Sequence, residues 1–185
     1  MVNNITTLSV LEPLLFKQEW MHLAEISREL KMPHPTARIY LNEFEKQGVV
    51  VKQTKGRLTL YKMNYANPLI VDYIILVEKN RLIDKSSKDV LLREIIYFLH
   101  NLNNPAIIFG SASLNLKNAD DIDLIIIADF DKNGFKEFEK KHDIKFHLIN
   151  LKKLEEINSS LKKEIIKKHL IIQDSESIIK WMLIN

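Results

Sequence analysis

The residues best suited to chemistry lie in the second half of the chain. An apolar run ends at Gly110 and Ser111, and Asp121 and Asp123 follow after a short spacer. If the aspartates lie on a strand, positions i and i+2 face the same side, so the carboxylates lie side by side. Two adjacent carboxylates repel each other unless a hard cation neutralises them. Their oxygen atoms are suitable ligands for Mg²⁺, which also binds the phosphates of a substrate. The bend before them offers backbone N–H groups and a hydroxyl to phosphate oxygens.

This spacing resembles the polymerase-β-like nucleotidyltransferase superfamily, in particular its small prokaryotic members, over residues 87–185. The family motif is a hydrophobic strand, Gly-Ser or Gly-Gly, a spacer and Asp-hydrophobic-Asp-hydrophobic. The resemblance implies that Gly110 and Ser111 hold the tail of a nucleoside triphosphate and that Asp121 and Asp123 bind Mg²⁺. It also implies in-line attack of an acceptor hydroxyl on the α-phosphorus, with release of pyrophosphate. The plainer alternative is a surface turn followed by a strand that begins with solvated acids.

The third carboxylate of that family has no clear equivalent here. The matching strand is expected at 145–150, where the aligned position holds His147. Phe146 and Leu148 face the other way, so His147 has the parity to face the site, whereas Asp143 lies about 13 Å back along the strand. Three interpretations stay open: His147 acts as base or ligand, the site is incomplete, or either the strand register differs or another acid enters the site.

Basic charge is concentrated in the first third of the chain. Residues 1–65 hold nine Lys or Arg and six Glu, whereas residues 66–185 hold 18 basic and 18 acidic residues. The whole formal excess of +3 therefore lies in the first third, which weakly indicates a polyanionic partner there.

The pattern of elements in this basic region is that of three helices followed by a hairpin. Apolar residues at helical spacing, a stop at Met32 and Pro33, and a glycine-containing tip between β-rich runs define them. The expected elements are helices over 7–18, 22–31 and 36–47 and a β-hairpin over 49–61. Together they resemble the winged helix-turn-helix family over roughly residues 5–63.

The winged-helix resemblance implies binding to double-stranded DNA. The N-terminal side chains of a helix in the major groove reach base edges, while basic wing residues neutralise phosphates. The base-contacting candidates are His34, Thr36, Arg38 and Asn42, and the phosphate-contacting candidates are Lys52, Lys55 and Arg57. Arg38 pairs bidentately with guanine and Asn42 with adenine in this interpretation. The alternative is a winged helix used only for protein contacts or dimerisation.

The remaining pattern completes an α+β protein. A boundary is expected at 64–68, and strand–helix alternation follows after residue 105. The expected elements are helices over 68–81, 87–101, 134–141, 152–157, 160–168 and 175–184 and strands over 106–109, 122–128 and 144–151. This predicts an N-terminal winged helix-turn-helix domain (1–65), a helical linker (66–86) and a nucleotidyltransferase-like α/β domain with a small mixed sheet (87–185).

Composition narrows the class of protein further. The chain has no cysteine, which excludes disulfides and thiolate metal sites. Its longest apolar segment, 69–77, is interrupted by Asp72 and is far shorter than the roughly 20 residues of a membrane span. The first residues do not have the pattern of a signal peptide. We therefore expect a cytoplasmic protein with no membrane partner.

Two functions follow as alternatives. The first is an Mg²⁺-dependent enzyme that transfers a nucleoside monophosphate from a triphosphate to a protein or RNA acceptor. By resemblance, small members of the superfamily act as antitoxins that modify a partner toxin, so a toxin-like acceptor belongs to this alternative. The second is a DNA-binding regulator whose degenerate transferase domain senses nucleotide or mediates assembly. Because winged-helix proteins often dimerise, a homodimer is expected in either case.

Overall fold

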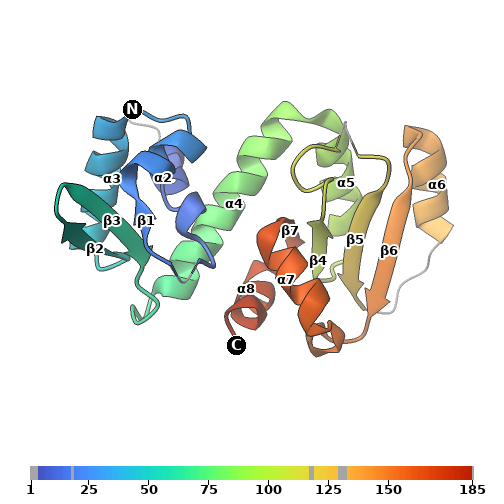
Figure 1. Cartoon of the computed structure of the whole chain (residues 1–185). Coiled ribbons are helices and arrows are strands. Elements are labelled where there is room, and N and C mark those ends of the chain that lie inside the picture. Colours follow the sequence, from blue (N-terminus) through green and yellow to red (C-terminus); the bar gives the residue numbers. More distant parts are fainter. Residues whose placement is uncertain (1–3, 18, 117–118, 129–132, 185) are drawn as a thin grey trace. The chain divides into compact units, whose positions relative to one another are not determined.

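The chain folds as an α+β protein with helices α1 to α8 and two small sheets of three and four strands (Figure 1). The computed structural model describes residues 4–17, 19–116, 119–128 and 133–184. Two compact units are present, Met1–Arg81 and Leu82–Asn185. Within the described residues, no helix combines the length and the apolar character that a bilayer span requires.

The first unit combines short helices with a three-stranded antiparallel sheet of order β1-β3-β2. Its elements are α1 (Asn4–Ser9), a 3₁₀ turn (Glu12–Leu14), β1 (Met21–His22), α2 (Leu23–Glu29), α3 (His34–Lys46), β2 (Val50–Lys55) and β3 (Leu58–Met63). Helix α4 (Ile70–Lys88) begins in this unit and ends in the second. Helix α3 carries Pro35 in its first turn, where no N–H is needed, and buries Ala37, Leu41 and Phe44 at helical spacing.

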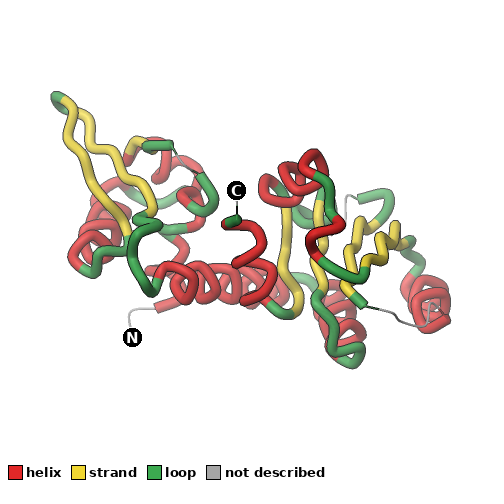
Figure 2. Tube along the Cα trace, turned by 90° about the horizontal axis from the view of Figure 1, so that it is seen from below, coloured by secondary structure: helices red, strands yellow, loops and turns green. Residues whose placement is uncertain are grey.

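Strands β2 and β3 form a long hairpin. The pairing of Lys55 with Leu58 leaves Gly56 and Arg57 as a two-residue turn, and Gly56 adopts φ +62°. In β2 only Val50 is buried, so the hairpin projects from the unit as the two long paired strands of Figure 2. The expected hairpin over 49–61 is therefore confirmed, with a basic, solvent-exposed tip.

Two expectations for the first 88 residues are wrong. The helix expected over 7–18 is broken, because α1 ends at Ser9 and a 3₁₀ turn holds Pro13, which lacks an N–H and restricts the residue before it. The helix expected over 68–81 continues to Lys88 as α4, since Asp89 then caps the next helix by accepting from the N–H of Leu92.

The second unit is a four-stranded mixed sheet with helices on both faces. The strand order is β6-β5-β4-β7, with β5 and β6 parallel and the other neighbours antiparallel. Its elements are α5 (Val90–His100), β4 (Ala106–Phe109), β5 (Ile122–Ile127), α6 (Asn133–His142), β6 (Phe146–Leu151), a 3₁₀ turn (Leu154–Glu156), α7 (Ser159–Lys167), β7 (His169–Gln173) and α8 (Ser175–Leu183). The small mixed sheet is confirmed, although the sequence analysis missed β7 and expected a helix where the 3₁₀ turn lies.

Successive side chains of a strand point to opposite faces of the sheet, so the position of a residue in its strand determines the face on which it lies. Ile108 and Leu124 pack into one apolar cluster with residues of α5 and α6. Ile107 and Ile125 are buried on the opposite face, where Figures 1 and 2 place α7 and α8. Asp123 has the parity of Ile125, so it projects on the α7–α8 face, away from the α5–α6 cluster.

Candidate functional sites

The bend after β4 lies directly against a carboxylate of β5. Gly110 adopts φ +67°, a conformation that side-chain-bearing residues rarely adopt. A Cβ atom at this position would lie 2.7 Å from Oδ2 of Asp123, so any other residue would displace this carboxylate. The glycine and the aspartate that the motif analysis selected are therefore in contact.

A short helical turn begins at Ser111. The N–H groups of Leu114 and Asn115 donate to the Ser111 carbonyl at 3.0 and 3.2 Å, and the Ser113 hydroxyl donates to the Gly110 carbonyl at 2.8 Å. The Gly110 N–H donates to the carbonyl of Lys168 at 3.1 Å, so this group of the bend is not available to a phosphate. Within the described residues, the N–H groups of Ser111 and Ala112 have no acceptor.

Asp123 and His147 are direct neighbours on parallel strands. Their Cα atoms are register partners, and His147 Nδ1 lies 2.9 Å from Asp123 Oδ1. Phe146 and Leu148 pack against the α5–α6 cluster and so fix this register. The expected parity of His147 is confirmed, and the interpretation that another register brings Asp143 to the site is wrong. The side chains of Asp123 and His147 are 25% and 62% exposed, so the pair is open to solvent on one side.

Asp121 lies just outside the strand. Strand β5 begins at Ile122, whose N–H donates to the Lys145 carbonyl at 2.8 Å, and Asp121 precedes it in an exposed bend. The strand expected over 122–128 begins at the expected residue, but the expectation that Asp121 also projects from this strand is wrong.

The strand contributes one carboxylate, Asp123, as an oxygen donor of the type that Mg²⁺ shares with substrate phosphates. Among the residues that the structure describes, no three His, Asp or Glu side chains gather closely enough to form a metal cage. Magnesium does not require one, because it is commonly held by one or two carboxylates, several waters and substrate phosphates. Asp123 is partly exposed beside Gly110 and Ser111, so its carboxylate is placed for this type of shared coordination.

A pocket of about 250 Å³ borders the same turn. Leu92, Leu116 and Leu170 contribute apolar walls, and Ser113 lies between this pocket and Gly110. On the rim, the Lys85 ammonium donates to the Leu114 carbonyl at 3.1 Å. The three leucines of the walls belong to the α5–α6 cluster, so the pocket lies on that side of the sheet, whereas Asp123 projects on the other side.

In the first unit, three of the predicted DNA contacts line one hollow. His34 and Arg38 from the first turns of α3 meet Arg57 from the hairpin tip around a space of about 180 Å³, and His22 completes the rim. The sequence analysis missed His22, because it reaches this position through the pairing of β1 with β3, which no local pattern signals. Of the other candidates, Thr36 is half-buried on α3 and Lys55 is exposed at the end of β2.

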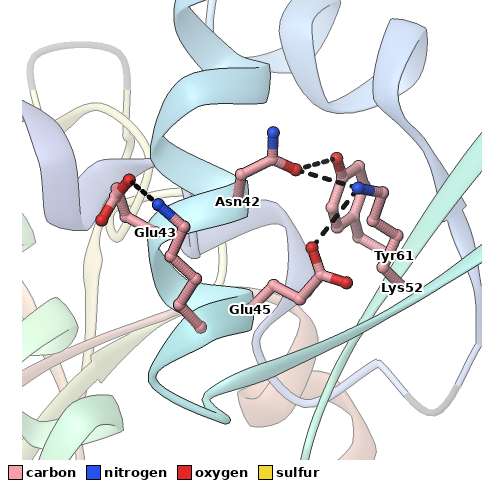
Figure 3. A network of polar contacts seen from close by, with 6 residues as sticks. Asn42, Glu43, Glu45, Lys52 and Tyr61 are labelled. Carbon is pink, nitrogen blue, oxygen red and sulfur yellow. Dashed lines mark hydrogen bonds and ion pairs between the residues drawn. The ribbon is translucent and has the colours of Figure 1, made fainter.

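Two further candidates are already engaged with each other (Figure 3). Asn42 Oδ1 accepts from the Tyr61 hydroxyl at 3.1 Å and from the Lys52 ammonium at 3.2 Å, and Lys52 also contacts Glu45 at 3.3 Å. Bidentate pairing with adenine needs both the oxygen and the nitrogen of an asparagine amide. The structure therefore argues against Asn42 as an adenine contact and against Lys52 as a free phosphate contact.

The environment of Tyr61 favours the neutral form of its phenol. Burial raises the pKa of the Tyr61 phenol, the Glu45 carboxylate raises it further, and Arg38 opposes both effects. The hydroxyl therefore remains a hydrogen-bond donor at neutral pH and keeps the Asn42 oxygen occupied.

Comparison of the chain with protein-family models, with curated proteins and with solved structures gives no match. The two candidate sites therefore rest on their own geometry. That geometry is a glycine bend packed on a strand carboxylate in the second unit and a basic hollow between helix and hairpin in the first.

Proposed function

We propose that the chain is a nucleotidyltransferase-like protein with a DNA-binding winged helix. In this proposal residues 1–65 bind double-stranded DNA, and residues 87–185 transfer a nucleoside monophosphate from a triphosphate to a protein or RNA acceptor with Mg²⁺. The observation that carries it is the approach of Gly110 to Asp123, where a Cβ atom would lie 2.7 Å from the carboxylate. A surface turn would account for the positive φ of this glycine, as at Gly56, but not for its close approach to Asp123.

The residues divide into phosphate-binding and metal-binding groups. The N–H groups of Ser111 and Ala112 and the Ser111 hydroxyl are positioned to donate to phosphate oxygens. Asp123, with Asp121 at the edge of the strand, would hold Mg²⁺, which when bound neutralises charge on the phosphate oxygens.

His147 has a role as the proton acceptor in this scheme. Its Nδ1–H donates to Asp123 Oδ1, which fixes the tautomer and leaves Nε2 as the basic nitrogen. The acceptor hydroxyl oxygen forms a bond to the α-phosphorus, the bond to pyrophosphate breaks, and the hydroxyl proton passes to Nε2 of His147. His147 thereby takes the place of the third carboxylate of the superfamily.

The test is incubation with labelled triphosphates, Mg²⁺ and candidate protein or RNA acceptors. Label is expected on an acceptor with the wild-type chain and is expected to fall at least about 100-fold with Asp123→Asn. Asp143→Asn is the matched control, because Asp143 is an exposed aspartate before β6 and lies outside the site. Equal labelling by both variants would show that Asp123 does not serve the reaction.

A second candidate function is favoured by one observation. Asp123 is engaged with His147 where the superfamily has a third acid, so the site is also compatible with nucleotide binding without transfer. In that case the protein is a DNA-binding transcriptional regulator whose second unit senses nucleotide or mediates assembly. No label would appear, while triphosphate binding and salt-sensitive duplex binding would persist, and Arg38→Ala would weaken only the latter.

A further inference from the structure

The basic hollow of the first unit gathers cationic side chains from three separate segments. It encloses about 180 Å³ between the end of β1, the first turns of α3 and the hairpin tip. The residues that line it are His22, Leu23, Ala24, His34, Arg38, Arg57, Leu58 and Thr59. No Asp or Glu stands among these described residues. The hollow therefore concentrates positive charge without a negative group of its own.

The two arginines of the hollow differ from the paired lysines of the same unit. Within the residues that the structure describes, neither Arg38 nor Arg57 has an ion pair or a hydrogen bond. By contrast, Lys17, Lys46 and Lys52 each contact a glutamate. Two like charges that line one hollow repel each other, and a bound anion removes this repulsion. The two arginines are therefore placed to share one anion.

Two further features add to the attraction for an anion. His34 is the first residue of α3, and no side chain caps this end of the helix. Its unpaired N–H groups and the helix dipole add partial positive charge beside the hollow. The Nδ1 atom of His22 is buried and has no hydrogen-bond partner in the described part of the chain. Buried polar atoms normally have a partner, so His22 is suited to hydrogen-bond a ligand.

We propose that the basic hollow binds the phosphate group of a phosphate monoester. Such a group carries a charge of about −1.5 to −2 at neutral pH, which matches the two permanent charges of Arg38 and Arg57. The planar fork of an arginine also binds two phosphate oxygens at once. A phosphodiester within a DNA strand carries only a single charge. The hollow therefore favours a monoester over the diester groups along a duplex.

A phosphate in the hollow has a consequence for DNA binding. Arg38 and Arg57 are also proposed contacts of duplex DNA, so this consequence rests on the proposed function, whereas the phosphate site itself does not. Two sources carry the monoester chemistry, a small free phosphate compound and the terminal phosphate of a nucleic-acid strand. A free compound in the hollow displaces the duplex, whereas a terminal phosphate strengthens duplex binding.

The first test is a titration of the full chain with inorganic phosphate, followed by backbone amide NMR at an ionic strength held constant with sodium chloride. We expect saturable shifts at the residues of the hollow. Arg38→Gln and Arg57→Gln should each raise the phosphate dissociation constant at least about tenfold, because each removes a charge-assisted contact. Arg28→Gln is the matched control and should change the constant less than about twofold, since Arg28 is an exposed arginine of the same unit outside the hollow.

Circular dichroism checks the fold of each variant. If a glutamine variant is misfolded, Arg57→Lys replaces it, because lysine keeps the charge and loses the planar fork. Arg57→Lys should weaken phosphate binding about threefold. Shifts that rise without saturation, or an Arg28→Gln effect as large as that of Arg57→Gln, overturn the proposal.

The second test separates the two sources. Fluorescence anisotropy compares duplexes of one sequence with and without terminal phosphates. If the source is a strand end, the phosphorylated duplex binds at least about fivefold more tightly, and Arg57→Gln removes the difference. If the source is a free compound, both duplexes bind equally, and inorganic phosphate displaces them more strongly than sodium chloride of the same ionic strength. Equal binding without such displacement overturns the shared use of the two arginines. A chain that binds phosphate but neither duplex contradicts the proposed function and leaves the phosphate site supported.

Discussion

The structure agrees with the predicted orientation of the candidate residues on β5 and β6, but not with that of Asn42 on α3. On helix α3, Asn42 turns back toward the hairpin and accepts hydrogen bonds from Tyr61 and Lys52. In the sheet, Asp123 and His147 lie side by side, as their strand positions indicated. A strand position fixes the direction of a side chain to one of two faces, whereas an exposed helix position lets a polar side chain find a partner close by. Functional predictions from strands are therefore firmer than those from helix surfaces.

Each unit has a glycine with a positive φ angle in a turn, and the two differ in their surroundings. Gly110 and Gly56 have similar positive φ angles of +67° and +62°. A Cβ at Gly110 would meet Asp123, whereas a Cβ at Gly56 would meet nothing within 4 Å. Replacing either glycine by alanine would therefore strain the backbone, but of these two positions only Gly110 would also bring the new Cβ against a carboxylate.

The largest effect is expected from Gly110→Ala. Left-handed strain costs about 1 kcal/mol, and displacement of the Asp123 carboxylate adds to it, so we expect the free energy of unfolding to fall by about 2–3 kcal/mol. Gly56→Ala should cost only about 1 kcal/mol. Urea denaturation measures both values. Equal losses at the two positions would mean that the Gly110 bend does not press on Asp123.

The next effect concerns duplex DNA. Arg38 lines the basic hollow, whereas the Asn42 amide oxygen is occupied. We expect Arg38→Ala to weaken duplex binding about tenfold and Asn42→Ala to weaken it less than about threefold. Fluorescence anisotropy at fixed salt measures the two constants, with circular dichroism as the folding control. If Asn42→Ala costs as much as Arg38→Ala, the network of Figure 3 must open on DNA, and the contrast between helix and strand predictions fails.

Local patterns predicted most of the elements but not the contacts between distant ones. The α3 helix, the hairpin and strands β4 to β6 follow from apolar periodicity, proline and glycine positions. Strands β1 and β7 were missed because their stability comes from pairing with β3 and β4, which lie far away in the sequence. The same reason explains why His22 in the hollow and the Lys168 carbonyl at Gly110 were not foreseen.

In the second unit, the sequence predicted which face of the sheet each candidate residue occupies, because side chains alternate between the two faces along a strand. Asp123 and His147 share a face because the apolar neighbours Phe146 and Leu148 fix one register. The start of β5 at Ile122 agrees with the strand expected over 122–128, and this start leaves Asp121 in the bend before the strand.

A smaller effect tests how firmly the α3 network is held. Tyr61→Phe removes the hydroxyl that donates to Asn42 and leaves Lys52 as its remaining partner. We expect the free energy of unfolding to fall by about 1 kcal/mol, the usual value for one hydrogen bond whose acceptor keeps another donor. Urea denaturation checks the value. A variant as stable as the wild type would mean that Asn42 is held by Lys52 alone and is easier to release toward DNA.

A pH dependence of stability is expected from the buried Tyr65 of the first unit. Burial raises the pKa of Tyr65 to about 12, and the Phe16 backbone lowers it by less. The ordinary tyrosine value in an unfolded chain is about 10, so the fold favours the neutral phenol. The stabilisation is complete below about pH 10 and is lost as the pH rises from there toward the folded pKa.

Alkaline urea titration of two tyrosine variants measures this effect. Between about pH 10 and pH 12 the wild-type chain should lose stability, and Tyr65→Phe should lose less because it has no phenol to ionise at that position. Tyr97→Phe is the control, since Tyr97 is exposed on α5 in the second unit, and its pH slope should equal that of the wild type. Equal slopes for the two variants would mean that the first unit does not shelter Tyr65 from solvent. Tyr65 in the first unit and Tyr97 in the second would then contribute equally to the pH dependence of stability.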